Sequence, residues 1–268
     1  MNYFQITDKE FNNFQTFIFD EAGISMADTK KQLVLNRLSK RLRHYGMTRF
    51  RDYFDLVHKP DHTHEKQLLI DLLTTNETYF FREPKHFEFV TDEILTSFKG
   101  GRFRCWSAAC SNGAEPYTLG MVIDHKLGAG RWEMLATDIS ARILQEAKQA
   151  AYSLKEAEKI PRELLIKYCL KGVRSQQGVM TIDKSIVNKI KFQRMNLNGI
   201  IPDTGKFDLI MLRNIMIYFD LETKIKLVDA LISRLYPGGY LIIGHSETLN
   251  AVTNKLTMIK PSVYRLES

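Results

Sequence analysis

Two carboxylates, Glu115 and Asp138, each follow a predicted buried strand in this sequence. Glu115 comes soon after the strand expected at residues 103–108, and Asp138 directly follows the strand expected at residues 133–137. Because ligands of open α/β sheets bind at the carboxyl ends of the strands, we expect both acids to border one crevice. A carboxylate at the end of the second strand can accept hydrogen bonds from both hydroxyls of a ribose. Two acids together disfavour a phosphate-bearing ligand, because like charges repel.

The same crevice favours a ligand that contains a ribose and a positive charge but no phosphate. S-adenosylmethionine has this combination. The loop before Glu115 agrees with it, since this loop carries Gly113 but lacks the Gly-x-Gly-x-x-Gly pattern of a diphosphate cradle. Each feature has a purely structural alternative. The loop could be an ordinary tight turn, and Asp138 could cap the helix expected from Ala141.

Polar residues follow two further predicted strands. Arg213 and Asn214 come after the strand expected at residues 207–212, and burying them is costly unless they have partners, so we expect them to face the crevice. Tyr218 could offer an aromatic face or a hydroxyl to the same site, with plain core packing as its alternative. Asn196 could present its amide to a purine edge, although a simple turn would also explain it.

The segment Thr74–Pro84 has the densest mixture of polar and aromatic residues in the chain. A flexible tether has no need of three consecutive aromatic residues followed by an arginine. We therefore expect this segment to fold back over the crevice, with Asn76, Thr78 and Arg82 facing the ligand.

The composition is that of a globular protein. The chain of 268 residues has 38 Lys and Arg against 31 Asp and Glu, a net charge of +7, and is 44% hydrophobic, which excludes wholesale disorder and collagen. Apolar runs stay well below the roughly 18 residues of a membrane helix, and the first residues lack a secretory signal, which favours a soluble, cytoplasmic protein. The cysteines form no Cys-x-x-Cys pair and His62-x-His64 has no nearby third ligand, so we expect neither disulfides nor a metal site.

Hydrophobic patterning divides the chain into three parts. Residues 1–73 are predicted to be helical, and residues 74–90 are predicted to link them to the rest and to contribute to the ligand site. In residues 91–268, strands alternate with helices, which predicts a mainly parallel, Rossmann-like α/β sheet covered on both faces. Residues at about 170–192 break this alternation and predict a small antiparallel insertion. Pro237-Gly238-Gly239 is expected to separate the last helix from the next strand.

One stretch of the helical part is strongly basic, since the sequence from Lys30 to Arg51 contains no acidic residue. Several of its cations recur at helical spacing, opposite an apolar face. We expect these residues to form a partner-binding face: Arg37, Lys40, Arg41, Arg43 and His44. A solvated basic face and a nucleic-acid surface are the alternatives.

Together these segments are similar to the CheR family of chemotaxis receptor methyltransferases. The resemblance covers most of the chain and rests on the basic helical part and on blocks in matching order: residues 75–82, 110–117, 136–138, 196–197, 213–219, 237–239 and 244–247. It implies a class I methyltransferase fold and S-adenosylmethionine-dependent esterification of glutamate side chains on the cytoplasmic helices of chemoreceptors. The products would be glutamate methyl esters and S-adenosylhomocysteine.

The resemblance also implies roles for individual positions. Cofactor contacts fall on Asn76, Thr78, Arg82, Glu115, Asp138, Asn196, Leu197, Arg213 and Asn214. Arg82 and Tyr218 are implied to lie nearest the transferred methyl group as catalytic residues, and the basic face is implied to bind an acidic receptor helix. The chain departs from the family pattern at Ala114, where a second acid is common. In some members the inserted subdomain binds a short peptide at the receptor's C-terminus, but here Arg174 replaces a glycine of that loop.

We expect a monomer that neither inserts into a membrane nor binds nucleic acid. Methylation of another protein or of nucleic acid is the rival enzyme function, although the Asn-Pro-Pro-Tyr-type signature of base amino-methylases is absent. A non-catalytic binding module is the rival outside the enzymes. Binding of S-adenosylmethionine would distinguish a methyltransferase from a non-catalytic binding module, since a module without the cofactor site would not bind it.

Overall fold

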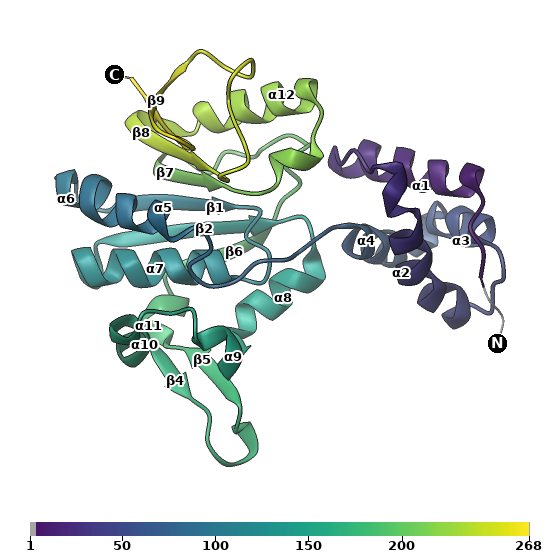
Figure 1. Cartoon of the computed structure of the whole chain (residues 1–268), viewed down its shortest axis with the longest axis horizontal. Coiled ribbons are helices and arrows are strands. Elements are labelled where there is room, and N and C mark those ends of the chain that lie inside the picture. The colour runs from purple at the N-terminus through teal and green to yellow at the C-terminus, as the bar shows by residue number, and fades with distance from the viewer. Residues whose placement is uncertain (1–3, 268) are drawn as a thin grey trace.

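The structure is a computed structural model that describes residues 4–267. Figure 1 shows a helical domain beside an α/β domain, from which a small sheet extends. The helical elements are α1 (Asp8–Ala22), η1 (Asp28–Lys30), α2 (Lys31–His44), α3 (Phe50–Val57), η2 (Pro60–His62) and α4 (Thr63–Leu73). Thr7 and Glu10 form a capping box at the start of α1, and Gly23 ends this helix with a φ of 71°. The predicted all-α N-terminal domain is confirmed.

A buried ion pair joins the helices of this domain. Arg41 on α2 donates two hydrogen bonds to the carboxylate of Glu65 on α4, at 2.8 and 2.7 Å. The hydroxyls of Tyr45 and Tyr53 also donate to Glu65, at 3.0 and 2.7 Å. Burial alone would raise the pKa of Glu65, but these donors lower it. Arg41 therefore stabilises the interior of the domain, and its role in partner binding stays a prediction.

Arg37 also has partners within the domain. Its Nη1 donates to the backbone carbonyls of Leu72 and Thr74, both at 2.8 Å, and so fixes the end of α4. The other predicted members of the basic face are exposed: Lys40, Arg43 and His44. Periodicity placed all of these residues on α2, but it could not show which of them have partners on other helices.

The main sheet has a reversal in its strand order. In the described residues it contains seven strands in the order β6-β2-β1-β7-β8-β10-β9. Their bounds are β1 (Phe103–Ala108), β2 (Trp132–Asp138), β6 (Ile190–Arg194), β7 (Phe207–Leu212), β8 (Leu235–Ile243), β9 (Leu256–Lys260) and β10 (Val263–Leu266). The strands β1, β2, β6, β7 and β8 run parallel, whereas β10 is antiparallel to β8 and β9. The chain proceeds from β1 to β2 and β6, and then returns to the other side of β1 with β7. This reversal creates a switch point at the carboxyl ends of β1 and β7, where such sheets bind ligands.

Helices cover both faces of this sheet. They are α5 (Pro84–Phe89), the π-helical turn η3 (Val90–Ile94), α6 (Leu95–Ser97), α7 (Ala114–Leu127), α8 (Ala141–Gln149), η5 (Met216–Tyr218) and α12 (Leu221–Ile232). Successive side chains of β7 point to opposite faces of the sheet and pack into two separate hydrophobic cores. Ile210 and Leu212 belong to the core that includes α12 and the N-terminal domain, whereas Leu209 and Met211 belong to the core that includes α5 and α7. Burial on both faces explains why this strand is a continuous apolar run, and the predicted Rossmann-like fold is confirmed. No helix in the described residues is long and apolar enough to cross a bilayer.

A small antiparallel sheet is inserted before β6. In the described residues its three strands are β3 (Ala151–Ser153), β5 (Val179–Ile182) and β4 (Cys169–Lys171), with β5 in the middle. Its helical elements are α9 (Leu154–Ala157), α10 (Arg162–Tyr168), η4 (Arg174–Gln176) and α11 (Lys184–Val187). An antiparallel insertion is therefore present, but it begins and ends earlier than the predicted 170–192, because β6 belongs to the main sheet. The strand β3 is too short to form a recognisable pattern, and its partner β5 lies far along the chain.

The predicted break at Pro237-Gly238-Gly239 is also corrected. These residues lie within β8, where the pairing with β7 shifts register between Phe207 and Leu209. Gly238 has a φ of 80°, and a Cβ on Gly239 would come 2.8 Å from the carbonyl oxygen of Tyr236. The glycines therefore accommodate a β-bulge within the strand.

Replacing Glu65 with alanine should lower the free energy of unfolding by about 3–5 kcal/mol, because it leaves the half-buried Arg41 without its counterion. Urea denaturation followed by circular dichroism measures this loss. Glu222 on α12 is the control, since it pairs with Lys226 on the exposed surface, and Glu222→Ala should leave the unfolding free energy nearly unchanged. Equal losses of unfolding free energy for the two variants would show that the buried pair between α2 and α4 stabilises the protein no more than an exposed pair does.

Candidate active site

A cavity of about 290 Å³ lies at the switch point of the main sheet. Its walls come from the loops after β1, β2, β6 and β7, from the segment that follows α4, and from residues 22–33 of the N-terminal domain. The residues that the sequence predicts as cofactor contacts all line it, together with the predicted catalytic Tyr218: Asn76, Thr78, Arg82, Glu115, Asp138, Asn196, Leu197, Arg213 and Asn214. The predicted residues thus come from five separate sequence segments, and residues 22–33 add a sixth segment to the cavity wall.

Asp138 is buried at the end of β2. Its Oδ2 accepts a hydrogen bond from the backbone N–H of Ser111 at 2.8 Å, and its Oδ1 accepts one from Ser140 at 3.0 Å. Burial raises the pKa of Asp138, and these two donors oppose that rise. The N-cap of α8 is Ser140, whose hydroxyl accepts from Ile143 at 3.2 Å, so the capping alternative for Asp138 is wrong. Each carboxylate oxygen of Asp138 still has acceptor capacity for a ligand hydroxyl.

Glu115 lies in the first turn of α7, which begins after Gly113. Gly113 has a φ of 89°, and a Cβ there would come 2.9 Å from Tyr152 Oη, so this turn requires glycine. One oxygen of Glu115 accepts from Ser107 Oγ at 2.7 Å, and the other accepts from Arg213 Nη1 at 2.9 Å. Burial raises the pKa of Glu115, while Arg213 opposes the rise. Two donors therefore hold this acid at the cavity wall.

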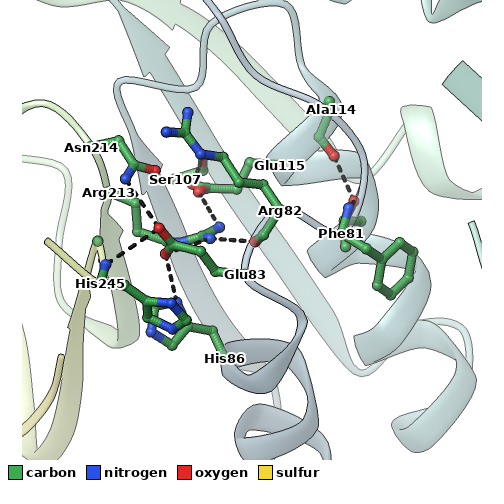
Figure 2. Close-up of polar contacts among 12 residues, drawn as sticks. Phe81, Arg82, Glu83, His86, Ser107, Ala114, Glu115, Arg213, Asn214 and His245 are labelled. Carbon is green, nitrogen blue, oxygen red and sulfur yellow. Dashed lines mark hydrogen bonds and ion pairs between the residues drawn. The ribbon is translucent and has the colours of Figure 1, made fainter. Parts of the chain in front are cut away.

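Arg213, at the end of β7, connects several parts of the site (Figure 2). Beside its bond to Glu115, its Nη2 donates to the carboxylate of Glu83 at 2.9 Å and to the carbonyl oxygen of Arg82. The guanidinium carbon lies 5.4 Å from the centroid of the Phe87 ring. The side chain is only 2% exposed, and its three oxygen partners account for how a cation can be buried there.

Residues 74–83, which we call the strap, connect α4 to α5 (Figure 1). Residues 74–78 and Arg82 of this segment line the cavity. The Ser111 hydroxyl donates to the carbonyl oxygen of Asn76 at 2.7 Å. The Arg82 side chain turns back to donate to the carbonyl oxygen of Glu77 at 2.9 Å. The strap is therefore held on the loop after β1, and Arg82 borders the cavity from this segment.

The N-terminal domain closes another side of the cavity. Asn196 Nδ2 donates to the carbonyl oxygen of Glu21 at 2.6 Å, and the backbone N–H of Ser25 donates to the carbonyl oxygen of Tyr218 at 2.7 Å. Apolar side chains complete this wall: Ile24, Met26 and Leu33. The Nδ2 group of Asn196 is thus already bonded to α1. This hydrogen bond reduces the capacity of the amide to donate to a purine edge. Sequence reasoning missed this wall because apolar residues around a helix end carry no motif.

Sequence reasoning also missed two acids, Glu83 and Glu247. Glu83 accepts from Arg213, from Asn214 Nδ2 at 3.1 Å and from the backbone N–H of His245 at 3.3 Å. Burial alone would raise the pKa of Glu83, but the hydrogen bonds from Arg213 and Asn214 lower it to about 2. Glu247 accepts from the backbone N–H of Asn214 at 3.0 Å. Glu247 lies in a block that carries the family resemblance, and Glu83 directly follows another such block, which was the available signal. Neither acid directly follows a strand.

Within residues 4–267, possible metal ligands gather where Glu83, His86 and His245 bring ligand atoms within 4.8 Å of one another. Arg213 already balances the charge of Glu83. Burial, reinforced by the positive charge of Arg213, lowers the pKa of His86 to about 3. A metal cation would meet the same repulsion, so we assign no metal to this cluster.

The groups around the cavity fit S-adenosylmethionine. Glu115 and Asp138 favour a cation and can accept from ribose hydroxyls, whereas Arg213 is engaged by protein oxygens and is not free for a phosphate. Leu197 and the apolar wall of the N-terminal domain offer a surface for an adenine ring. These acidic and apolar groups match a ligand that has an adenosyl group and a sulfonium but no phosphate.

Known proteins share these sequence features. Residues 76–265 match the family profile described as "CheR methyltransferase, SAM binding domain", and residues 9–74 match "CheR methyltransferase, all-alpha domain". The chain is 35% identical over 266 residues to the chemotaxis protein methyltransferase of Escherichia coli (strain K12), covering 97% of this chain and 92% of that protein. It is 35% identical over 272 residues to the chemotaxis protein methyltransferase of Borreliella burgdorferi, covering 97% and 95%. With both domains matched and the cavity built as described, the chain belongs to the CheR methyltransferase family, and its cofactor is S-adenosylmethionine.

Proposed function

We propose that this protein transfers the methyl group of S-adenosylmethionine to glutamate side chains on the cytoplasmic helices of chemoreceptors, as a protein-glutamate O-methyltransferase. The relatives in Escherichia coli and Borreliella burgdorferi carry the name chemotaxis protein methyltransferase. The strongest structural support is the shared cavity of Glu115, Asp138, Arg82 and Tyr218. The two acids suit the cofactor, while the arginine and the tyrosine border the same hollow from the strap and from η5.

The chemistry needs few protein groups. A glutamate carboxylate is ionised at neutral pH, so it can act as a nucleophile without a general base. In keeping with this, the described residues that line the cavity include no histidine. When bound, S-adenosylmethionine supplies an electrophilic methyl group on a positively charged sulfur. Arg82 orients the incoming carboxylate in this proposal, and Tyr218 borders the position of the methyl group.

The cavity walls contribute by excluding water. Because the reaction joins an anion to a cation, water stabilises the separate charges better than the transition state. The strap covers one side of the cavity, and Ile24, Met26 and Leu33 cover another. Alignment of the reactants in dry surroundings then supplies most of the rate enhancement.

The exposed basic residues of α2 form the proposed docking face for the receptor. Lys40, Arg43 and His44 are exposed, and an acidic helix would be attracted to them by charge. Arg37 and Arg41 support this face from inside the domain, through their bonds to the end of α4 and to Glu65. The protein acts as a monomer in this proposal, without nucleic acid.

The small antiparallel sheet is the proposed second contact, for a short peptide at the receptor's C-terminus. The strand β4 lies at an edge, and Leu170 and Val173 are 56% and 70% exposed. An extended peptide can add to such an edge through backbone hydrogen bonds. Arg174 has a φ of 54°, a conformation that the glycine of the docking-type loop adopts at lower cost.

Transfer of a labelled methyl group to membranes that contain chemoreceptors tests the reaction type. Mild alkali should release the label as methanol, because carboxyl methyl esters hydrolyse in base whereas methylated amines do not. Base-stable label would point to methylation at nitrogen or on nucleic acid and would overturn the proposal.

Replacing Arg82 with alanine should lower kcat by about 100-fold and change the Kd for S-adenosylhomocysteine by less than about threefold, because the arginine acts mainly on the substrate carboxylate. Methylation kinetics and isothermal titration calorimetry measure the two quantities. Arg102→Ala is the control, since Arg102 is exposed at the other end of β1. Weaker S-adenosylhomocysteine binding with normal turnover at saturation would contradict the assigned role.

Reversing the charges of Lys40 and Arg43 together, each to glutamate, should raise the KM for the receptor by about tenfold or more at low salt, with kcat retained. Added salt should shrink the difference, because it screens exposed charges. Reversing Lys99 and Lys126 gives an equal change in net charge beside α6 and in α7, at the opposite end of the molecule from α2 (Figure 1). A similar rise in KM for both double variants would exclude α2 as the docking face.

A further inference from the structure

We propose that Glu83 is a positioning residue for methyl transfer, whose carboxylate fixes both Arg213 and the strap at the cavity wall. The inference rests on the proposed function. Glu83 itself does not line the cavity, but its neighbour Arg82 and its partner Arg213 do. Any influence on the reaction must therefore pass through these two residues.

The carboxylate of Glu83 connects the strap to the ends of two strands. It accepts from Arg213 Nη2 at 2.9 Å and from Asn214 Nδ2 at 3.1 Å, both after β7, and from the backbone N–H of His245 at 3.3 Å, after β8. Figure 2 shows these donors converging on the one side chain. The Glu83 side chain is 14% exposed, so water cannot readily replace these partners. A single acid thus holds three chain segments together.

The backbone of the strap needs such an anchor. Phe81 and Glu83 have φ values of 56° and 59°, in the left-handed region that costs an L-residue about 1–2 kcal/mol. On one side of Arg82 the strap is held by the Phe81 N–H, which donates to Thr118 Oγ1 at 3.2 Å. On the other side it is held by the Glu83 carboxylate. Loss of the second anchor would let the strap relax and would change where the Arg82 side chain lies.

Arg213 carries the same constraint to Glu115. Its planar guanidinium donates through Nη1 to Glu115 and through Nη2 to Glu83, so one acid orients the group that holds the other. One guanidinium between two carboxylates leaves a net negative charge at this wall, which suits a cationic cofactor. Removing the charge of Glu83 would leave Arg213 and Glu115 as a neutral ion pair. The guanidinium would then be held by a carboxylate on its Nη1 side only.

A charged histidine does not explain this arrangement. His86 Nδ1 lies 3.4 Å from a Glu83 oxygen but makes no hydrogen bond to it. Burial lowers the pKa of His86 to about 3, so the ring is neutral at physiological pH, and it packs edge-on against His245 with centroids 4.5 Å apart. Arg213 is therefore the cation that balances Glu83.

Glu83→Gln and Glu133→Gln form a matched pair for the test. Glu133 also accepts from arginines, Arg102 and Arg104, but it lies near the start of β2, at the other end of the strands. Relative to Glu133→Gln, Glu83→Gln should lower kcat by about tenfold or more and change the Kd for S-adenosylhomocysteine by less than about threefold. Glu83→Asp keeps the charge and should recover part of the lost kcat.

Hydrogen exchange followed by mass spectrometry gives a readout that needs no receptor. In Glu83→Gln the amides of the strap should exchange at least about tenfold faster than in the wild-type protein, whereas Glu133→Gln should leave them unchanged. Unchanged exchange of the strap, or a kcat equal to that of Glu133→Gln, would overturn the inference. If the strap responds as expected but the wild-type protein forms no receptor methyl esters, the proposed function fails, and the anchoring of the strap by Glu83 stands.

Discussion

One buried cation organises the site. The Arg213 guanidinium lies between the carboxylates of Glu83 and Glu115 and also donates to the strap backbone. A buried charge is expensive unless every partner is in place, so the end of β7 is stable only when the strap and the first turn of α7 are both docked on it. The same requirement that stabilises this corner of the fold therefore also builds the acidic wall of the cavity.

The helix α2 links this wall to the proposed receptor surface. Leu33 near its start lines the cavity, whereas Lys40 and Arg43 are exposed further along the same helix. At 1.5 Å per residue these positions are about 10–15 Å apart along the helix axis. This separation is close to the diameter of one helix with its side chains, about 10–12 Å. A receptor helix bound to the exposed cations could therefore extend a glutamate side chain toward the cavity. Hydrogen bonds from Asn196 and Ser25 hold the two domains together beside the cavity.

Much of the fold and the set of cavity-lining residues could be predicted, because apolar runs mark the strands and parallel strands bring the polar residues that follow them to one edge. Asp138 illustrates this, although only the structure shows that Ser140 caps the next helix. The structural role of Arg41 could not be predicted, because its partner Glu65 lies on another helix and periodicity carries no information about such partners. Glu83 was missed for the same reason, since its donors come from distant segments. In each of these cases the missing information was a long-range pairing.

A crystal structure of the complex with S-adenosylhomocysteine tests most directly whether Glu115 and Asp138 border a single adenosyl site. We predict that the ribose hydroxyls lie within hydrogen-bond distance of the Asp138 carboxylate, and that the sulfur lies on the side of the cavity bordered by Arg82 and Tyr218. An adenosyl group bound outside this cavity, or bound inside it with the ribose turned away from Asp138, would contradict the assignment of the site.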